Sequence, residues 1–140
     1  MRLFFGLLLG AFIAGGADMQ ARTPERPLIR VSCPTDAPHL CQALIQVVSD
    51  MGTGGAVVRQ VPRGAEAPTL SGDIGIALLM QTISDSTLSG HLAWQTADQP
   101  MQSGPTLRMD QLDAPMTPAS YRSFAEQLLQ TSSGIVSALR

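Results

Sequence analysis

The chain has 140 residues, of which 44% are hydrophobic and 14% are charged, which is enough for one small globular domain. Its formal net charge is −2, from 9 basic and 11 acidic side chains, and this balance argues against a nucleic-acid-binding surface. Every basic residue is an arginine, so the chain offers no lysine nucleophile, lysine Schiff base or phosphate-loop lysine.

The N-terminal residues have the pattern of a secretory leader. Arg2 precedes an apolar stretch over residues 3–14, and small residues follow that stretch. A membrane-spanning helix needs about 20 apolar residues, which is more than this stretch provides. We therefore expect a signal peptide over residues 1–17, cleaved between Ala17 and Asp18, and a periplasmic or extracellular mature protein without a stable membrane span. An uncleaved anchoring N-terminus is the alternative.

The mature chain is expected to begin with an extended lead-in over residues 18–27, followed by a single domain over residues 28–140. Residues 28–33 alternate loosely between apolar and polar side chains, which predicts a first strand.

A helix is predicted to follow this strand. Thr35 or Asp36 would supply its cap, and Pro38 is tolerated in a first helical turn. Apolar side chains then recur at helical spacing up to Gly52, which ends the helix.

Two cysteines remain in the mature chain, and an exported protein meets an oxidising compartment. Cys33 ends the first strand and Cys41 lies one turn into the helix, so a disulfide between them is geometrically plausible. Such a bond would stabilise the fold by about 2–3 kcal/mol. A redox pair, which normally has two residues between its cysteines, is one alternative. A metal site with His39 and His91 is another, although the spacing fits no zinc pattern, and two free buried thiols are the third.

From residue 56 onward the hydrophobic period changes to two, which is typical of strands. Further strands are predicted at residues 56–61, 72–84, 88–95 and 106–111. The second and third of these should form a hairpin around the turn at Asp85 and Ser86. In the first we expect Val57 and Val61 to point inward, and the orientation of Arg59 stays open because it shares their parity.

A second helix is predicted to begin after Thr117, a plausible cap, with Pro118 at its first position, and to end near Gly134. The fold class that results is α+β, in the order β-α-β-β-β-β-α. We expect a small, mostly antiparallel sheet of about 4–5 strands with two helices packed on one face. This order of elements resembles that of small periplasmic domains such as the N-terminal domain of TolB, a resemblance that assigns no role to any residue.

The segment over residues 86–95 is the most distinctive part of the chain. Trp94 is either a core anchor or a partner-binding hot spot, whereas Ser89, His91 and Gln95 occupy the opposite, polar parity of the strand. Gly90 within the strand marks a bulge or the close approach of another backbone. Ser89, His91, Trp94 and Gln95 are therefore the candidate partner-binding residues, and a strand at the sheet edge would accept a partner strand.

No catalytic constellation stands out. Ser71 or Ser89 with His91 and Asp85 contains the residue types of a triad, but no Gly-x-Ser-x-Gly motif is present. We predict no catalytic residue, no metal ligand and no cofactor. Few aromatic residues remain after cleavage, which also speaks against single-stranded nucleic acid as a ligand.

The function favoured by these observations is that of a small, exported, non-enzymatic accessory protein. It would act in envelope, secretion or assembly processes by contacting another periplasmic or outer-membrane protein. Two alternatives stay open: a thiol–disulfide or other redox helper that uses Cys33 and Cys41, and a module that binds a small apolar ligand.

Overall fold

The computed structural model of the chain describes residues 27–52 and 55–139. The predicted leader and nearly all of the lead-in lie outside the described residues. The elements are β1 (Leu28–Ser32), α1 (Pro38–Met51), β2 (Val57–Val61), β3 (Ile74–Ile83), β4 (Thr87–Thr96), β5 (Gln102–Ser103), β6 (Leu107–Asp110), α2 (Pro118–Thr131) and α3 (Ser133–Leu139). The predicted α+β class is confirmed.

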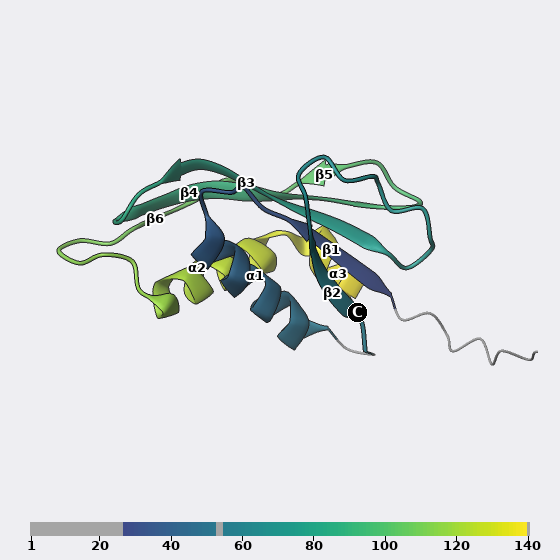
Figure 1. Cartoon of the computed structure of the whole chain (residues 1–140), viewed down its shortest axis with the longest axis horizontal. Helices are drawn as coiled ribbons and strands as arrows, with labels where there is room; N and C mark the ends of the chain where they lie inside the picture. The colour runs from purple at the N-terminus through teal and green to yellow at the C-terminus, as the bar shows by residue number, and fades with distance from the viewer. Residues whose placement is uncertain (1–26, 53–54, 140) are drawn as a thin grey trace, which may run out of the picture.

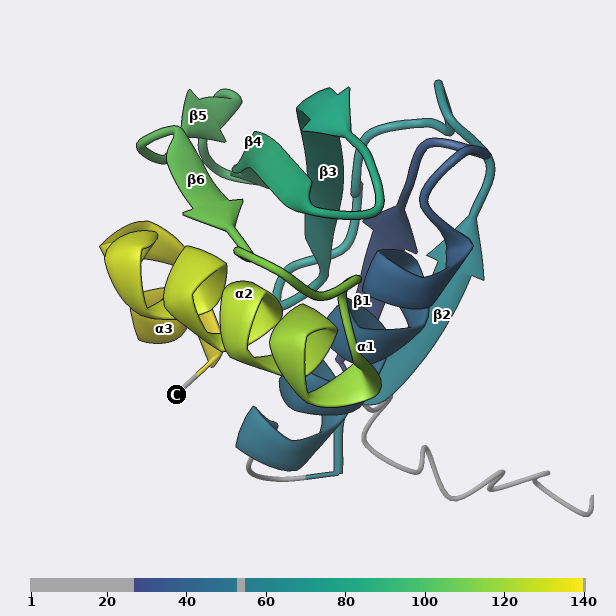
Figure 2. The same cartoon turned by 90° about the vertical axis from the view of Figure 1, so that its left-hand side faces the viewer.

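The strands form one mixed sheet, and the helices cover only one of its faces (Figures 1 and 2). The order across the sheet is β2-β1-β3-β4-β5, and β6 also pairs with β4. β1 runs parallel to both β2 and β3, whereas β4 runs antiparallel to β3, β5 and β6. Three of the five strand pairings are antiparallel, in agreement with the predicted mostly antiparallel sheet, but the parallel pairings of β1 and the two-residue β5 were not predicted.

Alternation along the strands builds the core between the sheet and the helices. In β1, Ile29 and Val31 are buried and their neighbours are only partly so. Together with Ile76 of β3 and Leu92 of β4 they meet the apolar stripe of α1 and α2, where Phe124 is fully buried. Burial of these side chains away from water is the main force that holds the helices on this face.

The two long helices begin in different ways. The N-cap of α1 is Ala37, and no side chain caps this end, so the prediction that Thr35 or Asp36 supplies the cap is wrong. At α2 the predicted cap is confirmed: Thr117 accepts a hydrogen bond from the Ser120 N–H, and the Ser120 side chain accepts one from the Thr117 N–H.

The orientation of β2 differs from the prediction. Val58 packs against the core, which places Val57, Arg59 and Val61 on the helix-free face. The register agrees, because Arg59 is the partner of Arg30, and Arg30 alternates with the buried residues of β1. Valines of both parities are present in β2, so its sequence pattern alone does not distinguish the two orientations.

β3 and β4 form the predicted hairpin, with a register shift between Met80 and Thr82 of β3. Gly90 of β4 lies opposite this irregularity. A Cβ at Gly90 would lie 2.5 Å from the Leu79 carbonyl oxygen and 2.5 Å from the Met80 Sδ. The close backbone approach predicted for Gly90 is therefore confirmed.

Replacing Gly90 by alanine should lower the free energy of unfolding by about 1–3 kcal/mol, because the Leu79 carbonyl belongs to the backbone and cannot yield without moving β3. Urea unfolding followed by circular dichroism measures this change. Gly75→Ala is the matched control, because a Cβ at Gly75 would meet Pro68 at an ordinary 3.4 Å. Gly64→Ala would not serve, because Gly64 has a positive φ. A Gly90→Ala variant as stable as Gly75→Ala would contradict this account.

Candidate functional site: an arginine-bordered groove

The sheet face that the helices leave uncovered is crossed by the connection between β2 and β3. β2 and β3 flank β1 on opposite sides, so residues 62–73 must pass over β1 to join them. Three contacts fix this connection to the sheet. Arg30 donates a hydrogen bond to the Glu66 carbonyl oxygen, Pro68 lies against Gly75, and Asp73 accepts a hydrogen bond from the Leu28 N–H at 2.9 Å.

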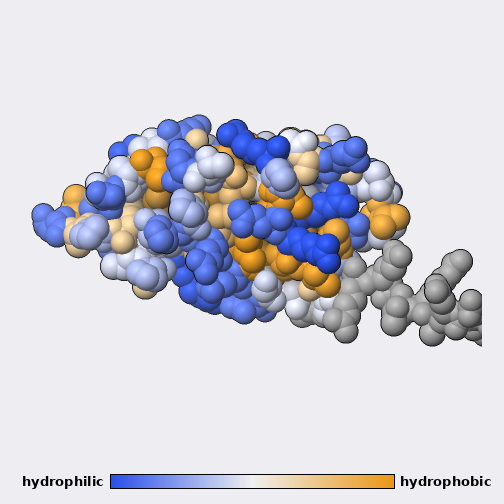
Figure 3. Space-filling view, in the orientation of Figure 1, coloured by the Kyte–Doolittle hydropathy of each residue, from blue (hydrophilic) through white to orange (hydrophobic). Residues whose placement is uncertain are grey.

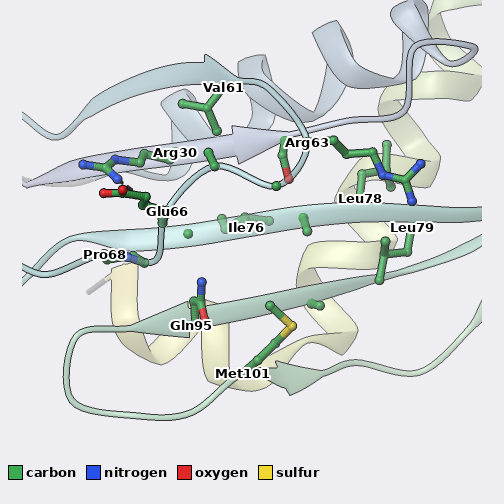
Figure 4. A pocket seen from close by; sticks show the side chains of 16 residues that line it. Arg30, Val61, Arg63, Glu66, Pro68, Ile76, Leu78, Leu79, Gln95 and Met101 are labelled. Atoms are coloured by element: carbon green, nitrogen blue, oxygen red, sulfur yellow. Dashed lines mark hydrogen bonds between the residues drawn. The ribbon is translucent and has the colours of Figure 1, made fainter.

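A groove of about 200 Å³ lies between this connection and the strands. Its apolar lining includes Ala77 and Leu79 of β3 and Ala93 of β4, with Val61 and Met101 at its sides. Figure 4 shows Arg30 and Glu66 side by side at one end of the groove, and Arg63 near Leu79 at the other. Gln95 and Met101 form the wall opposite β1 in the same view.

Three arginines border this face, and each lacks a carboxylate partner in the described part of the chain. Arg30 and Arg59 are register partners on adjacent parallel strands, and Arg63 follows directly after β2. None of the three takes part in an ion pair formed within residues 27–52 and 55–139. Like charges directly opposite each other on a sheet are destabilising. An anionic partner would remove that repulsion.

The other two arginines that the structure describes are already paired. Arg108 contacts Asp110 at 2.9 Å, and Arg122 contacts Asp50 at 2.9 Å and Glu126 at 3.0 Å. Hydrogen bonds from Arg108 and then from Thr87 lower the pKa of Asp110 below its ordinary value. The charges of Arg108 and Arg122 are therefore paired within the chain, in contrast to the three arginines that border the helix-free face.

A second depression, of about 620 Å³, lies between α1 and α2 on the helical side of the molecule. His39 stacks on Tyr121 there, with ring centroids 5.8 Å apart, and Arg122 is the paired arginine described above. His39 is thus an exposed stacking partner in the first turn of α1. The charge of Arg122 is already paired with Asp50 and Glu126, so we take the groove on the sheet, whose arginines have no such partner among the described residues, as the candidate site.

The structure divides the predicted partner-binding residues between the two faces of β4. Ser89, His91 and Gln95 lie on the helix-free face, and Gln95 lines the groove. Trp94 lies on the opposite face, is 7% exposed and belongs to the core. His91 is half-buried, and its Nδ1 is buried without a hydrogen-bond partner among the described residues.

β4 is an interior strand, with β3 on one side and β5 and β6 on the other. Its backbone is therefore already paired along most of its length, and the suggestion that this segment accepts a partner strand is wrong. The sheet edge on the β1 side is formed by β2.

The disulfide between Cys33 and Cys41 is present, with Cα atoms 5.8 Å apart. It joins the end of β1 to the first turn of α1, as predicted, and the two cysteines are 8% and 2% exposed. In the described ranges, no group of three or more His, Cys, Asp or Glu side chains is placed to hold a metal ion. None of the helices in the described residues is long and apolar enough to cross a membrane.

The arginines were missed as site residues because each is unremarkable in the local sequence. A signal was nevertheless present, since Arg30 stands between the buried Ile29 and Val31 and must therefore point to the other face. Its proximity to Arg59 depends on the pairing of β1 with β2, which no local pattern reveals. A comparison of the chain with protein-family models and with curated protein sequences finds no match.

Proposed function

We propose that the protein is exported to the periplasm and acts there as a non-enzymatic accessory protein that binds another protein. The binding surface is the helix-free face of the sheet, and the bound region of the partner is acidic with an apolar anchor. The observation that supports this most strongly is the apolar groove lined by Arg30 and Arg63, with Arg59 beside Arg30, on a face that no helix of the described residues covers. Arginine is enriched at protein interfaces because its planar guanidinium binds carboxylates in a bidentate manner.

The size of the groove supports a protein partner over a small ligand. Sites for small molecules typically measure about 300–1,000 Å³. The groove measures about 200 Å³, which suits one apolar side chain inserted from a partner's surface. This favours protein contact over the alternative of a module for a small apolar ligand.

The disulfide supports the proposed compartment, because such bonds persist in oxidising environments such as the periplasm. A redox role is less favoured, since thiol–disulfide exchange requires access to a sulfur atom and both cysteines are buried.

Photo-crosslinking in the native cells tests the proposal. A crosslinking residue at Met101, which is 59% exposed at the groove, should capture a protein of the same compartment. The double variant Arg59→Gln/Arg63→Gln should reduce this crosslink at least about tenfold, because two charge-assisted contacts are lost. Arg108→Gln is the control. It removes a positive charge from the same face of the sheet, but this charge is already paired with Asp110.

Two outcomes would contradict the proposal. One is a crosslink that survives in Arg59→Gln/Arg63→Gln as well as in Arg108→Gln. The other is a protein purified from the cytosol with residues 1–17 still attached, as determined by the intact mass, because export would then not take place.

A further inference from the structure

The two edges of the sheet are built differently. At one edge, β5 and β6 are separated by residues 104–106, which include Pro105, and β6 ends in the ion pair of Arg108 with Asp110. Proline, interruptions and charged side chains are the usual devices that prevent a strand from pairing with another chain. At the other edge, β2 pairs with β1 in continuous register over its whole length, and Arg59 is its one charged residue. The edge at β2 thus carries the charge of Arg59 but has neither the interruption nor the internal proline found at the edge formed by β5 and β6.

The hydrogen-bonding pattern shows which backbone groups of β2 have no partner among residues 27–52 and 55–139. The Val57 N–H donates to the Pro27 carbonyl oxygen at 2.9 Å, so Val57 directs its backbone groups toward β1. Because this direction alternates along a strand, Arg59 and Val61 also point toward β1, whereas Val58 and Gln60 point away from the sheet. A strand placed beside β2 would bond to the N–H and C=O groups of Val58 and Gln60.

The side chains on the helix-free face of β2 determine which side chains an added strand needs at the facing positions. They are Val57, Arg59 and Val61, in that order, and Val57 is 36% exposed. Figure 3 shows apolar surface over β1 and β2 with strongly hydrophilic residues set within it. A complementary strand presents an apolar, an acidic and an apolar side chain at alternate positions, because cross-strand neighbours on one face lie in contact.

A second copy of the chain fits this edge poorly. When two β2 strands pair antiparallel through Val58 and Gln60, Arg59 of one copy faces Arg59 of the other. That position is a non-hydrogen-bonded pair, in which the side chains approach most closely. Two arginines there would repel each other, beside the further positive charge of Arg30.

We propose that β2 binds an extended segment of a protein partner as an added strand, with an apolar-x-acidic-x-apolar pattern whose carboxylate faces Arg59. This inference rests on the proposed function and specifies how the partner is held. Backbone hydrogen bonds to Val58 and Gln60 supply affinity, and the pairing of the carboxylate with Arg59 and Arg30 supplies specificity.

The test uses the mature chain and the capped heptapeptide Thr-Val-Thr-Glu-Thr-Val-Thr as a probe. In NMR hydrogen exchange, the peptide should slow the exchange of the Val58 and Gln60 amides, which point away from β1 and have no partner among the described residues. A counterpart peptide with lysine in place of glutamate should bind at least about tenfold more weakly, since attraction to Arg59 becomes repulsion.

A matched pair of variants isolates the backbone contribution. Gln60→Pro removes one outward N–H at an edge position where proline is tolerated, and it should abolish binding of the glutamate peptide. Gln60→Ala removes the exposed side chain but retains the N–H, and it should bind as the wild type does. Thermal unfolding verifies that both variants fold. If Gln60→Pro does not fold, a peptide N-methylated at alternate residues should fail to bind the wild type for the same reason.

Several results would overturn strand addition. They are equal affinity for both peptides, equal binding by Gln60→Pro and wild type, no binding of the glutamate peptide, and protection mapped to residues outside β2. Protection of the same amides that rises with protein concentration without any peptide would identify a second copy as the occupant. Loss of binding in Arg59→Gln with full binding in Gln60→Pro would overturn strand addition alone and leave the proposed binding face intact.

Discussion

Replacing Trp94 by alanine should lower the free energy of unfolding by about 3–5 kcal/mol, the range typical of a large aromatic residue removed from a core. The side chain is 7% exposed and belongs to the main core cluster. It is also tightly enclosed. A Cβ at Gly134 of α3 would lie 2.6 Å from Trp94 Cζ2, and a Cβ at Gly104 would lie 3.4 Å from Trp94 Cζ3. Chemical denaturation followed by far-UV circular dichroism measures the loss.

The neighbouring residue provides the control. Gln95 is adjacent in β4 but lies on the helix-free face, so Gln95→Ala should change stability by no more than about 0.5 kcal/mol. If Trp94 were a partner-binding hot spot instead of a core anchor, Trp94→Ala would leave the free protein nearly as stable as the wild type. A loss below about 1 kcal/mol would therefore contradict its assignment to the core.

The elements with a strong local pattern could be predicted from the sequence. The apolar stripe ending at Gly52 identifies α1, and Thr117 with Pro118 marks the start of α2. Alternation over β3 and β4 identifies the hairpin and places Ser89 and His91 on the same face. In each case the period of the side chains directly reflects the geometry of the backbone, so no knowledge of distant contacts is needed.

The candidate site could not be predicted in the same way, because it depends on contacts between distant segments. Arg30 and Arg59 become neighbours only through the parallel pairing of β1 with β2, two strands that α1 separates in the sequence. The groove exists because residues 62–73 cross the sheet, and that path follows from the position of β1 between β2 and β3. The orientation of β2 was predicted wrongly because Val58 competes with Val57 and Val61 for the core.

The same distinction explains the two short elements that were not predicted. β5 is only the two residues Gln102–Ser103, and it is a strand because it lies beside Ala93 and Trp94 of β4. α3 is held by burial of Ile135 and Leu139 and by the contact of Gly134 with Trp94. Both owe their conformation to tertiary packing, which overrides weak local preference.

Removing the disulfide should also destabilise the protein, by about 2–3 kcal/mol in the double variant Cys33→Ala/Cys41→Ala. The bond closes a loop at a sequence separation of 8 and thereby restricts the unfolded chain. In the folded protein it fixes the exit of β1 against the first turn of α1, an end at which no side chain caps the helix. Urea unfolding of the double variant and of the oxidised wild type measures the difference.

Reduction of the wild type separates a structural bond from a redox-active one. With the cysteines 8% and 2% exposed, the bond should resist a mild reductant in the folded state and react once urea unfolds the chain. The reduced wild type should then lose about as much stability as Cys33→Ala/Cys41→Ala, because both lack the same cross-link. Rapid reduction of the folded protein, with one thiol alkylated near neutral pH, would instead favour the redox-helper alternative, since catalytic cysteines are accessible and have a lowered pKa.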